Sequence, residues 1–229
     1  MGPYLRTNKV SILKRSIFFL FGSLFTSSVF SQNLNLNSLT NNINENELKN
    51  LIYVYSSDFF KGRETGKIGQ KRAVKFISEY YKSINIKEAN GTEKYFQKME
   101  LNISGNIVQT ENVVAIIEGS EKPNEYIIIS SHLDHEGEKN GVIYNGADDN
   151  GSGTIGVLKI AEAFQNAVLS GYRPKRSIVF LHLTGEEKGL LGSKYYTDNP
   201  LYPLENTMVN LNIDMIGRID PKHINNEER

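Results

Sequence analysis

The stretch 176-RSIVFLHLTGEEKGLLGS-193 joins an apolar strand to a sharp turn that carries two adjacent glutamates. Its first half is a nearly continuous run of apolar residues, which is typical of a strand covered on both faces. Glu186 and Glu187 follow this run directly after Gly185. Neighbouring carboxylates repel each other and gain nothing from an apolar core. Their place at the end of a buried strand therefore indicates a chemical task.

The rest of the chain alternates between expected strands and helices. Apolar residues at helical spacing predict helices over 47–59, 73–84, 152–170 and 189–199. Apolar and β-branched runs predict strands over 95–101, 112–119, 125–135, 176–184 and 207–217. The stretch 136–151 is rich in Gly, Asn and Asp and predicts a loop. Strands that alternate with helices predict an α/β domain with a central mixed, mostly parallel sheet.

Acidic residues and one histidine stand where these strands end. In open α/β sheets, the loops beyond the carboxyl ends of the strands build the ligand site. We therefore expect four separate segments of the chain to bring their polar side chains to one edge of the sheet. These side chains are His132, Asp134, Asp148, Asp149, Glu186, Glu187 and Asp214.

So many acidic groups at one edge would repel one another unless a cation lay between them. Histidine nitrogen and carboxylate oxygen, without any thiolate, are ligands that suit zinc in a hydrolytic site. Glu186 and Glu187 need not share one task, because adjacent side chains point in different directions. One can coordinate the metal while its neighbour acts on a water as general base. The sequence therefore predicts a zinc site at this edge.

Each feature, taken alone, has a simpler explanation. A histidine at a strand end is more often a hydrogen-bonded polar residue than a ligand. The stretch 146-GADDNGSG-153 has the composition of a helix cap, and a glutamate pair is usually a solvated helix start. Their coincidence on one sheet favours the metal site. Of the other histidines, we expect His182 to lie in the core and His223 to have no role, while exposed-looking His135 leaves a minor binding role open.

The composition narrows the class of function. The chain has 229 residues, no cysteine and 26 basic against 26 acidic residues. It can form no disulfide, thiolate zinc site or cysteine nucleophile. Zero net charge gives no electrostatic reason to bind nucleic acid or an anionic membrane.

The first residues have the pattern of a signal peptide. Residues 1–31 combine a basic start, a short apolar run and an end in small residues. We expect cleavage before Gln32, a flexible lead-in over 32–46, and a secreted or periplasmic protein without stable membrane insertion after cleavage.

Four stretches together resemble, in order and spacing, the zinc aminopeptidases of peptidase family M28. They are SSHLDHEG at 130–137, NGADDNGSG at 145–153, RPKRSIVFLHLTGEEKGLLGS at 173–193 and LNIDMIGR at 211–218. Upstream, FFKGRETG at 59–66 resembles the family's N-terminal stretch. The resemblance implies the three-layer α/β/α fold of zinc exopeptidases over residues 47–229, and a peptide substrate with a free N-terminus.

The resemblance implies two zinc ions in a complete domain. His132 and Asp214 would bind one ion, and Glu187 would bind the other. Asp149 would bridge the two, and Asp148 would match the motif without being a ligand.

The resemblance also implies the chemistry of an aminopeptidase. Glu186 would take a proton from a water that zinc activates and pass it to the leaving amine. Asp134 would hold the ring of His132, as ligating histidines commonly require.

One part of the family pattern is absent from the chain as given. The pattern has a further histidine well beyond Asp214 as the last ligand of the second zinc ion, and His223 follows too early. We therefore expect a domain incomplete at its C-terminus, without its last strands, with an exposed apolar sheet edge and with one zinc ion or no activity as alternatives. A glutaminyl-cyclase-like enzyme, which uses a single zinc ion on the same scaffold, and a non-catalytic binding module remain alternative functions.

Overall fold

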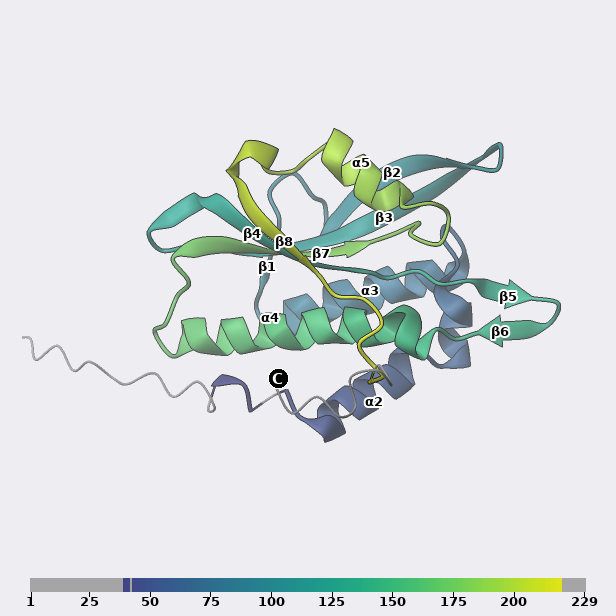
Figure 1. The fold of residues 1–229 in the computed structure, drawn as a ribbon, viewed down its shortest axis with the longest axis horizontal. Coiled ribbons are helices and arrows are strands. Elements are labelled where there is room, and N and C mark those ends of the chain that lie inside the picture. Colours follow the sequence, from purple (N-terminus) through teal and green to yellow (C-terminus); the bar gives the residue numbers. More distant parts are fainter. Residues whose placement is uncertain (1–38, 42, 220–229) are drawn as a thin grey trace, which may run out of the picture. The chain divides into compact units, whose positions relative to one another are not determined.

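The computed structural model describes residues 39–41 and 43–219, all within the unit Asn35–Arg229 (Figure 1). The predicted signal peptide 1–31, part of the predicted lead-in and His223 lie outside the described residues. Within the described ranges, no helix combines the length and the apolar character needed to cross a bilayer.

A six-stranded sheet forms the centre of the fold. Its strands are β1 (Lys87–Glu88), β2 (Phe96–Ile103), β3 (Asn106–Ile117), β4 (Lys122–His132), β7 (Arg176–Leu183) and β8 (Thr207–Asn212). The order is β1–β3–β7–β4–β8, and β2 also pairs with β3. Within this sheet β3 alone runs against the other strands, whereas β7, β4 and β8 are parallel neighbours. The predicted mixed sheet is therefore confirmed, with five of its six strands running in one direction.

Helices cover both faces of this sheet, which confirms the three layers (Figure 1). The helices α2 (Glu45–Tyr55), α3 (Ile68–Ser83) and α4 (Gly153–Leu169) lie on one side, and α5 (Leu191–Asp198) lies on the other. A short 3-10 segment, η1 (Asp58–Arg63), joins α2 to α3, and another, η3 (Leu204–Asn206), precedes β8. The expected helices thus all form, with ends shifted by a few residues.

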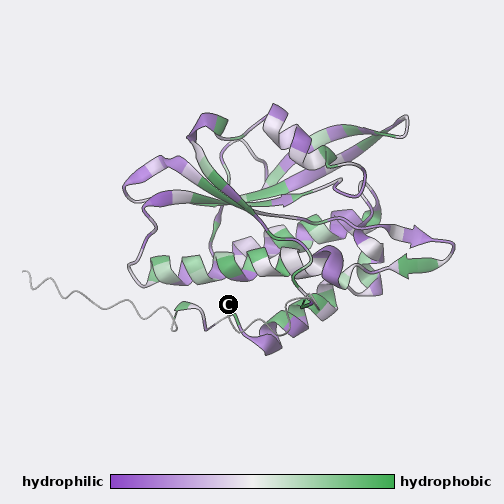
Figure 2. Cartoon of the chain, viewed as in Figure 1, coloured by the Kyte–Doolittle hydropathy of each residue, from purple (hydrophilic) through white to green (hydrophobic). Residues whose placement is uncertain are grey.

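The central strands are buried on both faces, which explains their continuous apolar runs. Successive residues of β3 point to opposite faces: Val113 packs in the core against α3 and α4, and Val114 packs in the core under α5. Phe180 and Val179 of β7 divide in the same way. Burial of each such large side chain stabilises the fold by about 1.5–3 kcal/mol. Figure 2 shows the apolar residues concentrated in these strands and along α4.

The stretch predicted as a loop over 136–151 contains regular structure. It holds a two-stranded hairpin, β5 (Gly137–Lys139) and β6 (Val142–Tyr144), and a helical turn, η2 (Ala147–Ser152), that leads into α4. Asn140 and Gly141 both have positive φ at the hairpin's tip, the conformation that Asn-Gly turns favour. The prediction of a plain loop was wrong, because the Asn-Gly turn lets the residues on either side of it pair as two strands.

The strand β8 forms one edge of the described sheet. Its side chains are largely exposed, including those of Met208, Val209 and Leu211. The expected exposed apolar edge is therefore present at this strand.

Candidate metal centre

The sheet topology brings the predicted site residues together. The strands β7, β4 and β8 are parallel neighbours, with His132 paired opposite Leu183 and Ser130 opposite Asn212. Their carboxyl ends therefore lie at one edge, and each is followed at once by residues of the site. The fourth segment is η2, which returns to the same edge just before α4.

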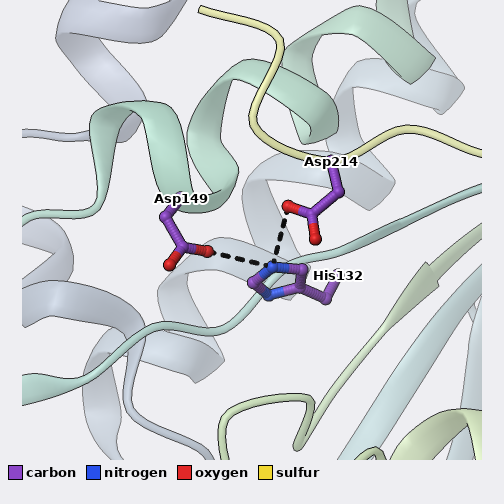
Figure 3. A group of neighbouring side chains, drawn as sticks. All are labelled: His132, Asp149 and Asp214. Atoms are coloured by element: carbon purple, nitrogen blue, oxygen red, sulfur yellow. Dashed lines mark ion pairs between the residues drawn. The ribbon is translucent and has the colours of Figure 1, made fainter. Parts of the chain in front are cut away.

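One group of side chains surrounds the ring of His132 (Figure 3). Its Nε2 atom lies 3.1 Å from Asp149 Oδ1 and 3.4 Å from Asp214 Oδ1, and both carboxylates point at this nitrogen (Figure 3). Zinc ligands at tetrahedral angles are about 3.3–3.4 Å apart, given Zn–N and Zn–O distances near 2.0–2.2 Å. The two separations therefore match a tetrahedral zinc site.

A second group lies beside the first and shares Asp149. His135 Nδ1 lies 2.7 Å from Glu187 Oε1 and 3.9 Å from Asp149 Oδ2. Asp149 thus offers one oxygen to each group, and the ligand atoms within each group lie within 4.8 Å of one another. The structure brings together all four residues predicted as ligands. It also adds His135, whose side chain is only 13% exposed, so the expectation of an exposed residue there was wrong.

The site attracts positive charge. Burial acts to lower the pKa of His132, but carboxylates including Asp134, Glu186 and Asp214 outweigh it and raise this pKa from 6.5 to about 9. Without metal the imidazole is therefore a cation at neutral pH, held where a metal ion would bind. Metal binding has to release this proton, because only the neutral ring is a ligand.

Glu186 lies in an environment that suits a proton acceptor. Partial burial raises its pKa, and repulsion from Glu187, Asp134 and Asp214 adds to this effect, while His132 opposes it. A raised pKa brings a carboxylate closer to the working pH of a general base.

The carboxylate of Asp134 fixes the turn of the two glutamates more directly than it fixes His132. It is fully buried and accepts hydrogen bonds from Thr65 Oγ1 at 2.9 Å and from the backbone N–H groups of Glu186 at 3.1 Å and Glu187 at 3.4 Å. The Nδ1 atom of His132 lies 3.2 Å from the backbone oxygen of Asp134 but 3.8 Å from the carboxylate. The ring is thus held through the main chain, because three other donors already occupy the side chain.

The glutamate turn is closed by Asn112 of β3 and Gly192. Asn112 accepts a hydrogen bond from the N–H of Thr184 and donates to the carbonyl of Gly192, at 3.0 and 3.1 Å. A Cβ on Gly192 would lie 2.1 Å from the carbonyl oxygen of Thr184. Only glycine therefore allows the chain to turn back this tightly after the glutamates.

The acidic loop before α4 also holds the segment that carries Asp214. Asn150 donates to Ile213 O at 3.0 Å and accepts from the N–H of Met215 at 3.3 Å. Asp148 accepts from the N–H of Gly217 at 2.8 Å. Asp148 thus lies outside both ligand groups and instead holds the backbone next to Asp214 by a hydrogen bond.

Arg63 supports the segments that carry the site residues, and the sequence did not reveal this role. It is fully buried, and its guanidinium donates to the carbonyls of Leu133, Tyr55, Asn145 and Gly146 at 3.0, 3.2, 2.7 and 2.7 Å. It therefore ties the segment after β4 to the loop that carries Asp149. FFKGRETG resembles the family's N-terminal stretch, but nothing local marks its arginine, because its partners at Leu133 and Gly146 lie 70 and 83 residues away.

His182 is a core residue, as predicted. Its ring is fully buried, with Nε2 at 2.7 Å from the hydroxyl of Tyr81 and Nδ1 at 3.1 Å from that of Ser131. Burial lowers its pKa to about 3, so the ring is neutral and separate from the acidic edge.

The sequence profile of peptidase family M28 matches residues 112–228, just over half of the chain. The chain belongs to peptidase family M28. A probable zinc metalloprotease of Pyrenophora teres f. teres is 36% identical over 118 residues, which cover 48% of this chain and 23% of that protein. Aminopeptidase NAALADL1 of Rattus norvegicus is 35% identical over 108 residues, covering 46% and 14%. The chain thus spans less than a quarter of the length of these two relatives.

Solved structures of two kinds share the fold of this M28 chain. A Zn-dependent exopeptidase from Parabacteroides distasonis aligns with a TM-score of 0.56 at 18% identity, over 73% of this chain and 61% of that one. Glutaminyl cyclase of Porphyromonas gingivalis aligns with a TM-score of 0.58 at 19% identity, over 73% and 61%. At these identities the likeness shows the fold alone.

Proposed function

We propose that this M28 chain forms the metal-binding part of a zinc-dependent aminopeptidase. The observation that carries the proposal is the position of Asp149, whose two oxygens face two separate groups of histidine and carboxylate ligands. The names of the zinc metalloprotease and aminopeptidase relatives support the same activity.

The donors fit zinc ions. They are imidazole nitrogens and carboxylate oxygens, which suit zinc in hydrolytic sites. His132, Asp149 and Asp214 would hold one ion, and Glu187 would hold the second together with Asp149. When bound, zinc supplies Lewis acidity that polarises a carbonyl and lets water lose a proton near neutral pH.

The remaining steps fall to the chain's own side chains. Glu186 takes a proton from the attacking water, whose oxygen bonds to the carbonyl carbon of the first peptide bond. Glu186 then gives the proton to the amide nitrogen as the C–N bond breaks. The acidic edge attracts a protonated α-amino group, and this favours substrates with a free N-terminus over internal peptide bonds.

The test compares Glu186→Gln with Asp149→Ala in zinc content and in hydrolysis of aminoacyl nitroanilides. Glu186→Gln removes the proton acceptor and leaves the ligands, so we expect unchanged zinc and a loss of about 10²–10⁴-fold in turnover. Asp149→Ala removes the shared ligand and should lower the zinc content. Glu79→Gln on the exposed side of α3 is the matched control. Normal turnover by Glu186→Gln, or full zinc content in Asp149→Ala, would contradict the assignment.

A glutaminyl-cyclase-like activity is the second candidate, favoured by the shared fold of the Porphyromonas gingivalis enzyme. Release of ammonia from a peptide with N-terminal glutamine, with one zinc ion per chain and no nitroanilide hydrolysis, would support it. Zinc binding without either reaction would support a non-catalytic binding module.

A further inference from the structure

We infer that a basic trough at the outer edge of the sheet binds the acidic part of a peptide whose N-terminus lies at the metal centre. The trough consists of two hollows that meet at Lys94 and Phe96, and none of its lining residues belongs to the metal centre. The inference rests on the proposed function and adds a substrate class to it, namely peptides with acidic side chains from about the fifth residue onward.

The two hollows form one continuous surface feature. The first has a volume of about 700 Å³ and lies between the second half of α3, β1 and the turn before β2. The second, of about 390 Å³, lies between the start of α3 and the strands β2 and β3. It reaches Thr110, whose hydroxyl lies 2.8 Å from that of Thr184, two residues before Glu186. The second hollow therefore ends next to the turn that carries the two glutamates.

The trough is basic, although the chain as a whole has no net charge. Six lysines and four glutamates line it. Three of the lysines are each paired with a glutamate. The ammonium groups of Lys82, Lys87 and Lys94 have no ion pair or hydrogen bond with any residue that the structure describes. These three groups are therefore free to pair with the carboxylates of a bound peptide.

A strained turn presents Lys94 and Tyr95 to the trough. The N–H of Phe96 donates to the carbonyl of Glu93 at 3.0 Å, and Lys94 and Tyr95 have positive φ values of 54° and 73°. Such mirror-image turns favour Asn and Gly, because bulky residues are strained at positive φ. Backbone strain persists only where the surroundings fix it, and it is common at ligand-binding positions. Here the N–H of Val114 fixes the carbonyl of Tyr95 at 2.8 Å.

The trough lies within reach of a peptide held at the metal centre. Phe96 pairs with Val113, which pairs with His182. His182 in turn pairs with Ser131, the residue before His132. Three strand spacings of about 4.7–4.9 Å each separate Phe96 from Ser131 by about 14 Å. An extended chain covers about 3.3–3.6 Å per residue, so the trough would receive the fifth and later residues of a substrate.

The binding test measures fluorescence anisotropy of labelled peptides with the metal-free full chain. The probe is an N-acetylated peptide with a run of glutamates, because acetylation removes the amine that the metal centre would attract. The same peptide with glutamines is the uncharged control. The variants are Lys82→Gln, Lys87→Gln and Lys94→Asn, singly and together. Lys49→Gln is the matched control, because Lys49 is exposed on α2 and lies outside the trough.

We expect the wild type to bind the acidic peptide and to bind the uncharged peptide at least about 10-fold more weakly. One exposed ion pair changes affinity by up to about 5-fold, so the triple variant should bind the acidic peptide at least about 10-fold more weakly. Lys49→Gln should bind as the wild type does. Lys94→Asn should weaken binding without lowering the urea midpoint, because Asn tolerates positive φ better than Lys.

The kinetic test uses the zinc-loaded full chain and a peptide with a free N-terminus and glutamates from its fifth residue onward. The triple variant should raise KM for this peptide and leave kcat unchanged, because the trough contributes binding far from the reacting carbonyl. Hydrolysis of aminoacyl nitroanilides, which are too short to reach the trough, should not change.

Three results would overturn the inference while the proposed function stands. The first is equal binding of the acidic and the uncharged peptide. The second is a triple variant that binds the acidic peptide as tightly as the wild type. The third is an equal loss of affinity in Lys49→Gln, which would reveal only a general effect of charge. Binding of the acidic peptide without cleavage of any peptide would instead refute the proposed function and leave the binding site for acidic peptides in place.

Discussion

Replacement of Arg63 by methionine tests whether one buried guanidinium holds the metal-binding segments together. Methionine keeps an unbranched apolar side chain but removes every donor. Leu133 O keeps a hydrogen bond from the Tyr55 hydroxyl, and Gly146 O keeps one from the N–H of Gly151. The carbonyls of Asn145 and Tyr55 have no other donor among the described residues.

The expected loss of stability follows from these two carbonyls. The carbonyl of Tyr55 is buried, and a buried acceptor left without a partner costs about 1–3 kcal/mol. The carbonyl of Asn145 is only half-buried, so we expect the free energy of unfolding to fall by about 1–3 kcal/mol. For a domain of this size, each kcal/mol lowers Tm by about 2–4 °C. Zinc affinity should fall as well, because Arg63 no longer fixes the loop of Asp149 against the segment of His132.

Urea unfolding and calorimetry of the metal-free protein measure the first effect, and zinc titration measures the second. Arg63→Lys is the matched variant, because one ammonium cannot reach four carbonyls in the geometry of a guanidinium. Its free energy of unfolding should lie between those of the wild type and Arg63→Met. Arg173→Met is the control, because Arg173 is exposed and donates one exposed hydrogen bond, to Glu118 O at 3.1 Å. It should change stability by less than about 0.5 kcal/mol.

Two outcomes would refute this reasoning. If Arg63→Met and Arg173→Met unfold at the same urea concentration, the four hydrogen bonds do not stabilise the fold. If Arg63→Met is destabilised yet binds zinc as tightly as the wild type, the guanidinium supports the fold without positioning the site.

Three further changes should have measurable effects. Gly192→Ala should cost about 1–3 kcal/mol in urea unfolding, because its Cβ would collide with Thr184 O; unchanged stability would contradict the tight turn. Burial holds the pKa of His182 near 3, below its value in the unfolded chain. The contribution of His182 to the free energy of unfolding is therefore complete above pH 6.5, and it falls by about 1.4 kcal/mol per pH unit on acidification. His182→Gln should weaken the dependence of the unfolding free energy on pH, and an unchanged dependence would contradict the buried, neutral state of His182. Zinc at about 100 times its Kd should add about 2.7 kcal/mol of stability, and an unshifted Tm would exclude a zinc site.

The local pattern of the chain was enough to predict the sheet and most of the centre. Apolar runs predict β4 and β7, because a strand that is covered on both faces needs apolar residues on both faces. Parallel neighbours end at the same edge, so the polar residues after β4, β7 and β8 could be expected to meet there. The β5–β6 hairpin was missed although its Asn-Gly turn was visible, because the surrounding glycines and asparagines resembled a loop.

The sequence by itself determined the α/β fold, the resemblance of its motifs to peptidase family M28, and four candidate ligands, His132, Asp149, Glu187 and Asp214. The fold class follows from periodicity, whereas the four ligands are those that the resemblance to the family implies. Only the tertiary structure decided that His135 faces Glu187 and that Arg63 ties the two loops together. Both depend on contacts between residues about 50 to 80 positions apart, and such contacts exist only once the sheet has brought its strand ends to one edge.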